Sequence, residues 1–273
     1  MANDEKLVEE VVGESSAGGE AEKADDAVAG EEALDDAQSG SENETGADGG
    51  ETVSPEDGEG DKQIDFDALL KKKRFSLFLK RCFDITASAL GLLFLAIPFG
   101  VIAIIIKATS KGPVYFRQVR VGKDGKEFRI FKFRTMVVDA EKKGMQITVG
   151  ADNRITGIGK FLRKTKVDEL PQLINVLIGD MSFVGPRPEV PRYVAMYSDY
   201  QRNILKIKPG ITELASIVYR DENDVLAKSE DPEATYVNEI MPKKIELNIQ
   251  YMQKLGFWYD IKLIFMTFAA ILR

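Results

Sequence analysis

The sequence contains no histidine and a single cysteine, Cys82, among its 273 residues. The absence of histidine excludes a Ser-His-Asp or Cys-His catalytic relay, an HExxH zinc site and an imidazole general base. A single cysteine excludes an intramolecular disulfide, a CxxC redox pair and a cysteine-rich metal site. Polar chemistry in this chain must therefore depend on carboxylates, lysine, arginine, hydroxyl groups or a metal bound through oxygen.

Residues 1–62 also lack Phe, Trp and Tyr, and they contain 21 acidic but only 3 basic residues, a net charge of −18. The remaining residues, 63–273, carry a net charge of +11, although the whole chain has −7. A segment so poor in apolar side chains cannot offset the entropy lost on folding. We therefore predict a disordered acidic tail at 1–62, without the pattern of a secretory signal, and one domain at 63–273. A solvated spacer is favoured over a partner-binding or self-masking role for the tail.

Residues 85–106 form a run of 22 residues without a charge, and a helix needs about 20 to span the hydrocarbon layer. Basic residues flank both ends, which draws both ends to the cytoplasmic side. Pro98 removes a helix hydrogen bond and predicts a kink. These features favour a re-entrant helix that breaks at Pro98 and returns, with a kinked single span or a buried core helix as alternatives. The preceding residues, 63–84, mix apolar and basic side chains as an interfacial helix does.

Two β-rich runs, VYFRQVRV and EFRIFKFR, flank the sequence Lys123-Asp124-Gly125-Lys126. Asp-Gly between such runs predicts a β-hairpin. Lys132 and Arg134 are two residues apart on the second strand, so they share a face. This pair suits a polyphosphate, and an exposed charged face is the alternative.

Asp168 and Glu169 precede a segment with apolar residues at helical spacing. Pro171 is tolerated only in the first turn, so we expect the helix to begin near the two carboxylates. From the residues alone, helix capping is the favoured role for this pair.

In Gly185-Pro186-Arg187-Pro188 two prolines flank one arginine, which predicts a stiff loop that presents a guanidinium to a phosphate. A structural turn with an incidental arginine is the alternative. The chain has no Walker motif. Near the carboxyl end, Pro242 is expected to open a helix with Ile245, Ile249 and Met252 on one side. A short apolar segment after Trp258 is expected to lie in the membrane interface or against the membrane segment.

Four stretches together resemble the bacterial sugar transferases, the monotopic polyprenyl-phosphate phosphoglycosyl transferases that begin glycan assembly. They are RCFDITASALGLLFLAIP, KGPVYFRQVRVGKDGKEFRIFKFRTM, DNRITGIGKFLRKTKVDELPQLINVLIGDMSFVGPRPEVP and KPGIT. The resemblance covers about 200 residues, in family order, from Phe75 to the end, and it identifies a small, catalytic-core type. The expected fold is α+β and mainly helical, with a re-entrant membrane helix broken at Pro98, a small β-hairpin and interfacial amphipathic helices. Within the domain the expected parts are 63–84, 85–106 and a cytosolic catalytic part, 107–273.

The resemblance also implies roles for particular residues, in place of the capping role. Asp168 would be the nucleophile that attacks the β-phosphate of a UDP-sugar, and Glu169 would assist with proton or metal handling. Mg²⁺, or Mn²⁺ in its place, would neutralise the phosphates and contact Asp168. The residues expected to bind phosphate are Lys132, Arg134, Arg163 and Arg187.

The implied reaction transfers a sugar phosphate to undecaprenyl phosphate, releases UMP and passes through a covalent aspartyl intermediate. It would initiate exopolysaccharide, capsule, O-antigen or glycoprotein glycan assembly at the cytoplasmic face of the bacterial inner membrane, alongside downstream glycosyltransferases. The alternatives are a membrane-associated, metal-dependent glycosyltransferase that releases UDP and a non-catalytic assembly scaffold. Anionic lipid is a more natural partner than nucleic acid for a basic domain with a membrane segment.

Two positions depart from the family pattern. Ile97 stands just before the proline, where members often have a hydroxyl residue, which leaves the kink angle and insertion depth open. Glu213 follows KPGIT, where many members have glycine, so the sugar or uridine contacts of this loop are not transferred to this chain.

Overall fold

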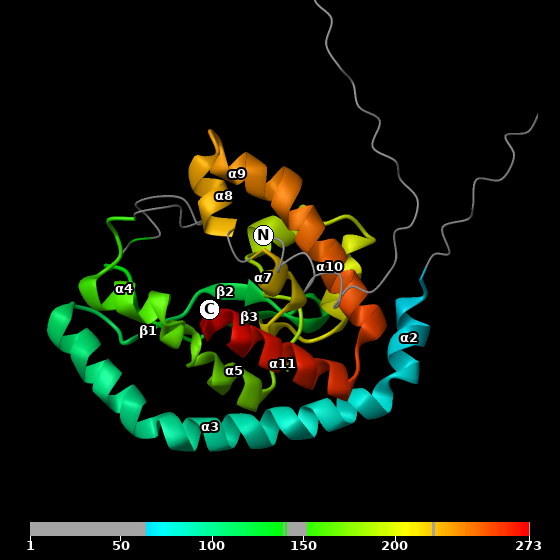
Figure 1. The fold of residues 1–273 in the computed structure, drawn as a ribbon, viewed down its shortest axis with the longest axis horizontal. Helices are drawn as coiled ribbons and strands as arrows, with labels where there is room; N and C mark the ends of the chain where they lie inside the picture. Colours follow the sequence, from blue (N-terminus) through cyan, green and yellow to red (C-terminus); the bar gives the residue numbers. More distant parts are fainter. Residues whose placement is uncertain (1–63, 139, 141–151, 220–221, 273) are drawn as a thin grey trace, which may run out of the picture.

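The computed structural model describes residues 64–138, 140, 152–219 and 222–272. The acidic tail predicted at 1–62 lies outside these residues. Within the described ranges the chain is mainly helical, with three two-stranded sheets, so the mainly helical α+β class is confirmed (Figure 1).

The interfacial and membrane segments were expected to meet at residue 84, but the break between the two helices lies at Lys73. A short helix, α2 (Phe66–Lys72), is capped by Asp65, which accepts hydrogen bonds from the backbone N–H groups of the first turn. One long helix, α3 (Arg74–Thr109), then continues without interruption through Pro98. It bends toward its carboxyl end (Figure 1), in the half that contains this proline, whose ring crowds the preceding turn. A return through the membrane remains a prediction.

Among the described residues, α3 is the one helix that is long and apolar enough to cross a membrane. Only 11% of its most apolar 18-residue window is buried inside the protein, whereas the core helix of a soluble domain would be mostly buried. An apolar surface of this extent marks an interaction site. The large exposed side chains on its apolar part are Ile85, Leu90, Leu93, Phe94, Ile97, Val101, Ile104 and Ile105.

The predicted hairpin is confirmed. Strand β2 (Val119–Val121) pairs antiparallel with β3 (Glu127–Arg129). Asp124 and Gly125, in the short 3-10 turn η1 (Lys123–Gly125), both have positive φ, 57° and 73°, as the favoured two-residue hairpin turn requires. Strands β1 (Tyr115–Phe116) and β4 (Lys132–Phe133) form a second antiparallel pair at its base.

The central part packs α5 (Gln172–Ile178) against α3. Arg81 of α3 donates to the carbonyl oxygens of Val176 and Leu177 at 2.7 and 3.0 Å, which satisfies the last turn of α5. The other central elements are α4 (Gly157–Lys164), η3 (Val167–Glu169), β5 (Ser182–Val184), α6 (Pro191–Val194), η4 (Gln201–Lys206) and β6 (Gly210–Thr212), with β5 and β6 parallel.

The predicted carboxyl-terminal helices are present as α10 (Met241–Lys254) and α11 (Phe257–Leu272), and Ile245, Ile249 and Met252 are buried as expected. Pro242 lies in the first turn of α10, as predicted, but the helical path also continues backward to α9 (Pro232–Thr235). The π turn Tyr236–Ile240 joins the two, and such a wider turn accommodates a proline ring that would crowd an α-helical carbonyl. The remaining helices are α7 (Leu214–Val218) and α8 (Glu222–Lys228).

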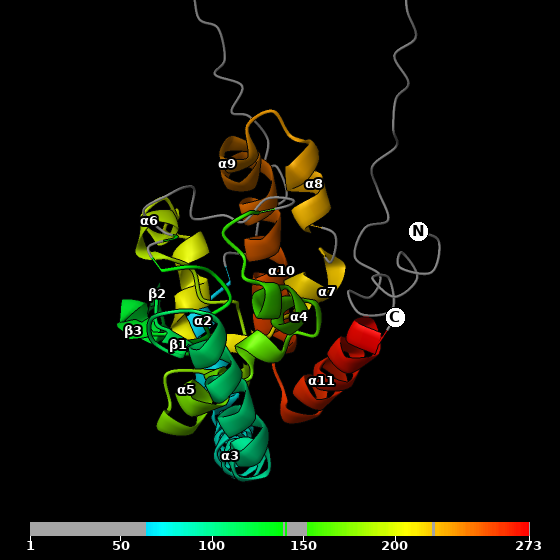
Figure 2. The same ribbon diagram turned by 90° about the vertical axis from the view of Figure 1, so that its left-hand side faces the viewer.

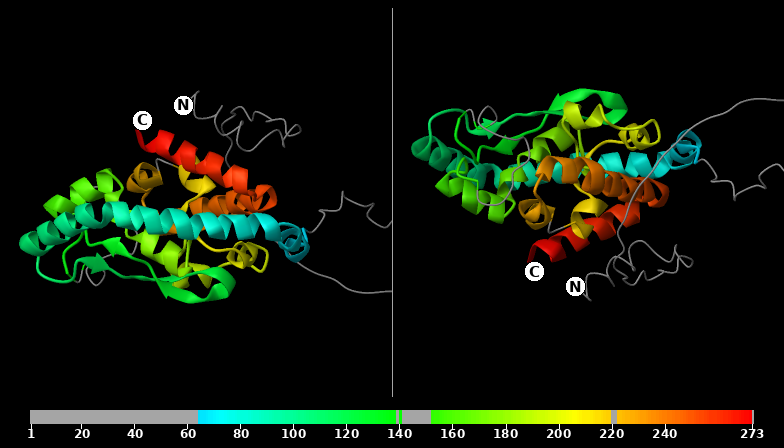
Figure 3. Two further views of the ribbon diagram at one scale, coloured as in Figure 1. Left: turned by 90° about the horizontal axis from the view of Figure 1, so that it is seen from below. Right: turned by 90° about the horizontal axis from the view of Figure 1, so that it is seen from above.

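Two main hydrophobic clusters hold these elements together. The larger is centred on α10 and includes Ile249, Leu226 and Leu263, and the smaller joins the second half of α3 to β4 and α4 through Phe99, Phe133 and Leu162. Helix α11 begins beside α3 and then diverges from it (Figure 2). Helix α3 runs between the hairpin on one side and α11 on the other (Figure 3).

Candidate active site

The two adjacent carboxylates lie in the 3-10 turn η3, between α4 and α5. Helix α5 begins at Gln172, three residues later than expected. Pro171 has no N–H, and the backbone N–H groups of Glu169 and Leu170 bond three residues back, to Lys166 and Val167, which is the 3-10 pattern. The carboxylates therefore precede the helix instead of forming its first turn.

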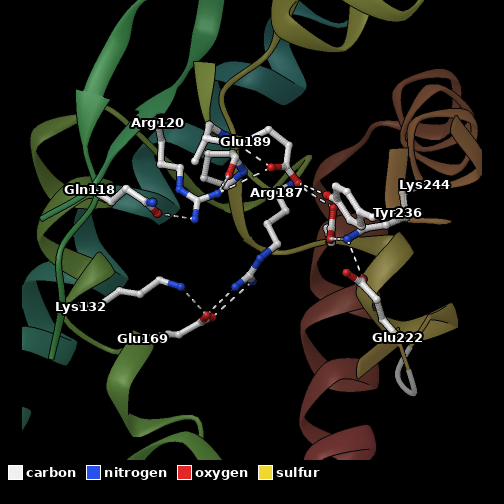
Figure 4. A network of polar contacts seen from close by, with 12 residues as sticks. Gln118, Arg120, Lys132, Glu169, Arg187, Glu189, Glu222, Tyr236 and Lys244 are labelled. Carbon is white, nitrogen blue, oxygen red and sulfur yellow. Dashed lines mark hydrogen bonds and ion pairs between the residues drawn. The ribbon is translucent and has the colours of Figure 1, made fainter. Parts of the chain in front are cut away.

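Glu169 is held by two cations from separate parts of the chain (Figure 4). Lys132 of β4 donates to its carboxylate at 2.8 Å, and Arg187 donates to both oxygens at 2.5 and 3.4 Å. Burial alone would raise the pKa of Glu169, but the charges of Arg187 and Lys132 outweigh it and hold the pKa well below its usual range. Glu169 is therefore a fixed anion that orients the side chains of Lys132 and Arg187.

Asp168 has the opposite environment. Its residue is only 8% exposed, yet no side chain or backbone group of the described residues donates a hydrogen bond to its carboxylate. Burial, followed by the negative charge of Glu169, raises its pKa, and the charges of Lys132 and Arg163 act against this rise. Asp168 thus keeps its carboxylate oxygens available for an incoming reactant.

The loop that carries Arg187 is braced from behind. Gly185 approaches the following segment so closely that a Cβ atom there would lie 2.4 Å from the carbonyl oxygen of Lys208. The backbone N–H of Arg187 donates to the carboxylate of Glu213 at 2.8 Å. Glu169 provides the main cause of the raised pKa of the Arg187 guanidinium. The loop therefore presents a charged arginine in a fixed position.

Glu213 is the centre of a buried polar cluster that the sequence reasoning did not assign to the site. It is 2% exposed, accepts from Ser216 Oγ at 2.7 Å and lies 3.9 Å from Lys244 Nζ. Lys244 also bonds Glu222 at 2.9 Å (Figure 4). The sequence did mark this position, because Glu213 stands after KPGIT, where many members of the resembled family have glycine.

A second carboxylate, Glu189, closes the other side of the Arg187 loop. It accepts a hydrogen bond from the hydroxyl group of Tyr236 and lies 3.7 Å from Arg120 Nη1. Arg120 also donates to the carbonyl oxygen of Pro188 at 3.0 Å and to Gln118 at 2.7 Å (Figure 4). The loop is therefore fixed at both ends by groups from the hairpin and the carboxyl-terminal helices.

The two other residues predicted to bind phosphate, Arg163 and Arg134, differ in their position relative to the carboxylates. Arg163 of α4 donates to Thr135 Oγ1 at 2.9 Å and is near enough to Asp168 for their charges to interact. Arg134 is not directed at the carboxylates. It donates to the carbonyl oxygen and hydroxyl group of Ser110, at the end of α3, at 2.8 and 2.6 Å. The structure thus brings Lys132, Arg163 and Arg187 around the two carboxylates and places Arg134 apart from them.

A divalent cation can be accommodated at Asp168, although no cluster of three or more His, Cys, Asp or Glu side chains suited to a metal occurs in the described part of the chain. Glu169 is occupied by two cations, so Asp168 is the one carboxylate of the pair available as an oxygen ligand. Mg²⁺ is commonly bound by one or two carboxylates together with substrate phosphates and water. The donor set fits such a shared site.

Residues 75–273 match the bacterial sugar transferase family. The chain is 43% identical over 197 residues to UDP-glucose:undecaprenyl-phosphate glucose-1-phosphate transferase of Klebsiella pneumoniae, covering 70% of this chain and 40% of that protein. It is 36% identical over 200 residues to UDP-N-acetylgalactosamine-undecaprenyl-phosphate N-acetylgalactosaminephosphotransferase of Aeromonas hydrophila, covering 71% and 44%. An uncharacterized sugar transferase of Bacillus subtilis, EpsL, is 35% identical over 196 residues, covering 72% and 88%. The chain thus spans about two fifths of the length of the larger relatives.

Proposed function

Because the chain belongs to the bacterial sugar transferase family, we propose that it transfers a sugar phosphate from a UDP-sugar to undecaprenyl phosphate and releases UMP. The observation that carries this proposal is the contrast between Asp168, which no described residue binds, and Glu169, which two cations hold. Relatives named for transfer of glucose 1-phosphate and of N-acetylgalactosamine phosphate to undecaprenyl phosphate support the reaction class.

In the first step an Asp168 carboxylate oxygen attacks the β-phosphorus of the UDP-sugar. The bond between that phosphorus and the bridging oxygen breaks, UMP leaves with this oxygen, and an aspartyl phosphosugar forms. In the second step an oxygen of undecaprenyl phosphate attacks the same phosphorus and releases the Asp168 carboxylate. The sugar phosphate is thereby transferred whole, and the enzyme is restored.

The cations around Asp168 supply the charge that this chemistry needs. Lys132 and Arg187 are aligned by Glu169 and would bind the phosphate oxygens as charge accumulates, while Arg163 supports the other side of Asp168. Mg²⁺ bound to Asp168 and the diphosphate would add further charge neutralisation. The low pKa of Glu169 keeps it ionised, so we assign it the positioning of two cations instead of proton transfer.

The acceptor explains why such a site belongs on a membrane protein. The exposed apolar side chains of α3 support a position of the domain at the lipid surface, where the phosphate of undecaprenyl phosphate lies. We assign the catalytic part to the cytoplasmic face of the inner membrane, since both flanks of the apolar segment are basic.

The direct test is product identity with purified full-length chain, undecaprenyl phosphate, Mg²⁺ and a panel of UDP-sugars that begins with UDP-glucose and UDP-N-acetylgalactosamine. We expect UMP and a lipid diphosphate sugar from at least one donor. Release of UDP would instead show a glycosyltransferase, and absence of turnover with every donor would favour a scaffold role.

A further inference from the structure

A basic cavity of about 490 Å³ lies at the other end of α5 from the catalytic carboxylates. It is enclosed by α2, the first turns of α3, the segment before β6 and the turn of the hairpin. Its apolar lining comes from Leu70, Leu77, Ile207 and Leu255. None of the residues that line it belongs to the site around Asp168 and Glu169, so the cavity is distinct from the site of phosphosugar transfer.

The charges that line the cavity are strongly unbalanced, with seven basic side chains and one acidic side chain, Asp84. Asp84 is already bound, because it accepts from Ser182 Oγ at 3.1 Å and from the backbone N–H of Phe183 at 3.0 Å. Three of the basic side chains have carboxylate partners, Lys80 with Asp260, Lys206 with Asp67 and Lys123 with the adjacent Asp124. No carboxylate of the described residues pairs with Lys71, Arg74, Arg81 or Lys208.

Two of these cations converge at the carboxyl end of α5. A Cβ atom on Gly179 would lie 3.1 Å from Arg81 Nη2 and 3.3 Å from Lys208 Nζ. Arg81 donates only to backbone carbonyl groups, whose partial charge does not neutralise it. Burial and the positive charge of Arg81 lower the pKa of Lys208. The converging cations create a site for an anion.

The cavity opens beside an apolar surface. Phe75 and Phe78 of α3 are 72% and 63% exposed and adjoin Arg74 and Leu77, which line the cavity. A basic pocket next to exposed aromatic side chains matches the boundary between lipid headgroups and acyl chains. We propose that the cavity binds the phosphate headgroup of an anionic membrane lipid, with the acyl chains along the apolar lining and α3. This contact would hold the amino-terminal half of α3 at headgroup level.

The test is titration of the full chain in neutral detergent with dihexanoyl phosphatidylglycerol, followed by the rise in Tm that a ligand of the folded state produces. Dihexanoyl phosphatidylcholine and inorganic phosphate are the comparison ligands. We expect a saturable rise with phosphatidylglycerol alone. Lys208→Gln and Arg74→Gln should each weaken apparent affinity about fivefold, the effect of one cation near an anionic surface. Lys72→Gln, an exposed neighbour outside the cavity, is the matched control and should bind as the wild type.

Three outcomes would overturn the proposal. The first is an affinity for inorganic phosphate equal to that for phosphatidylglycerol, which would indicate a free-phosphate site. The second is an unchanged affinity for phosphatidylglycerol in both cavity variants. The third is binding seen only after deletion of Met1 to Lys62, which would mean that the acidic segment occupies the cavity. Since no carboxylate of the described residues pairs with Lys208 or Arg74, their variants are expected to fold. The readout is independent of turnover, so the result stands whether or not the proposed reaction is correct.

Discussion

At the residue scale, two adjacent carboxylates have opposite physical states because of what surrounds them. Both are desolvated, which alone favours the protonated form. Lys132 and Arg187 reverse this for Glu169, whereas Asp168 is bound by no donor of the described residues and also experiences the charge of Glu169. A buried carboxylate kept available at a cost in stability is what a nucleophile requires.

Asp168→Asn should therefore abolish activity and raise stability. Turnover should fall by about 10⁴-fold or more, as for loss of other nucleophiles. A raised pKa means that the ionised carboxylate destabilises the fold above that pKa, and that this cost disappears as the pH falls through it. The Tm of the variant should thus exceed that of the wild type at pH 7 to 8 and converge with it in acid. Thermal unfolding in detergent measures this, and a lower Tm at pH 8 would contradict it.

Glu169→Gln should have the reverse effect on stability. Its depressed pKa contributes stability that is present above the ordinary carboxyl pKa and is lost as the pH falls through the folded value. Replacing the charge leaves Lys132 and Arg187 with weaker acceptors, which lowers the free energy of unfolding by about 1–3 kcal/mol. Each kcal/mol lowers Tm by roughly 2–4 °C. Activity should fall about 10²-fold or more. An unchanged Tm at pH 8 would refute the assigned role.

Glu213→Gln tests the support behind Arg187. The buried carboxylate accepts the Arg187 N–H and faces Lys244, so loss of its charge should leave Lys244 poorly compensated and loosen the loop. We expect kcat to fall about tenfold with a smaller change in KM for the UDP-sugar. A change in KM alone would instead indicate that Glu213 contacts the donor.

At the element scale, the position of Arg187 depends on a close approach of two backbone segments that only glycine permits at position 185. Gly185→Ala should displace the Arg187 loop, because the new Cβ would meet the Lys208 carbonyl group at 2.4 Å. Gly157→Ala is the matched control, since no heavy atom of the described residues lies within 4 Å of a Cβ there. Overpacking costs about 1–3 kcal/mol, so the first variant should lose both Tm and activity and the control neither. Wild-type turnover in Gly185→Ala would contradict this account of the loop.

Element types were largely predictable from the sequence, and the exceptions have local causes. The Asp-Gly pair specified the hairpin turn, and the spacing of Ile245, Ile249 and Met252 specified the buried side of α10. Helix α5 began later than expected because i to i−3 bonding around Pro171 favours a 3-10 turn. Pro242 lies in the first turn of α10 as expected, but a π turn before it continues the helical path, which residue spacing did not indicate. Each exception depends on backbone geometry that residue spacing does not encode.

At the scale of the whole molecule, the site assembles groups from the hairpin, the turn before α5, the Arg187 loop and α10. The family resemblance predicted five residues that the structure brings together: Asp168, Glu169, Lys132, Arg163 and Arg187. It could not predict a part in the site for Glu213, Glu189 or Tyr236, because they act through contacts between segments distant in the chain. For the same reason it could not show that Arg134 binds the end of α3.

We also expect the acidic segment, residues 1–62, to be dispensable for catalysis. Deletion of Met1 to Lys62 should leave kcat and KM unchanged in detergent, since every group assigned to the site lies in the domain that follows. A large loss of turnover in the deleted chain, with Tm unchanged, would show that the segment takes part in the reaction.

The covalent intermediate at Asp168 is tested most directly by a single-turnover reaction with a UDP-sugar labelled at the β-phosphate, in the absence of undecaprenyl phosphate. We expect release of up to one equivalent of UMP per protein and retention of the label on the protein. Mass spectrometry after proteolysis should map that label to Asp168. Asp168→Asn should release no UMP and retain no label. Release of UDP, or release of UMP only when the lipid acceptor is present and without labelled protein, would contradict a covalent aspartyl phosphosugar.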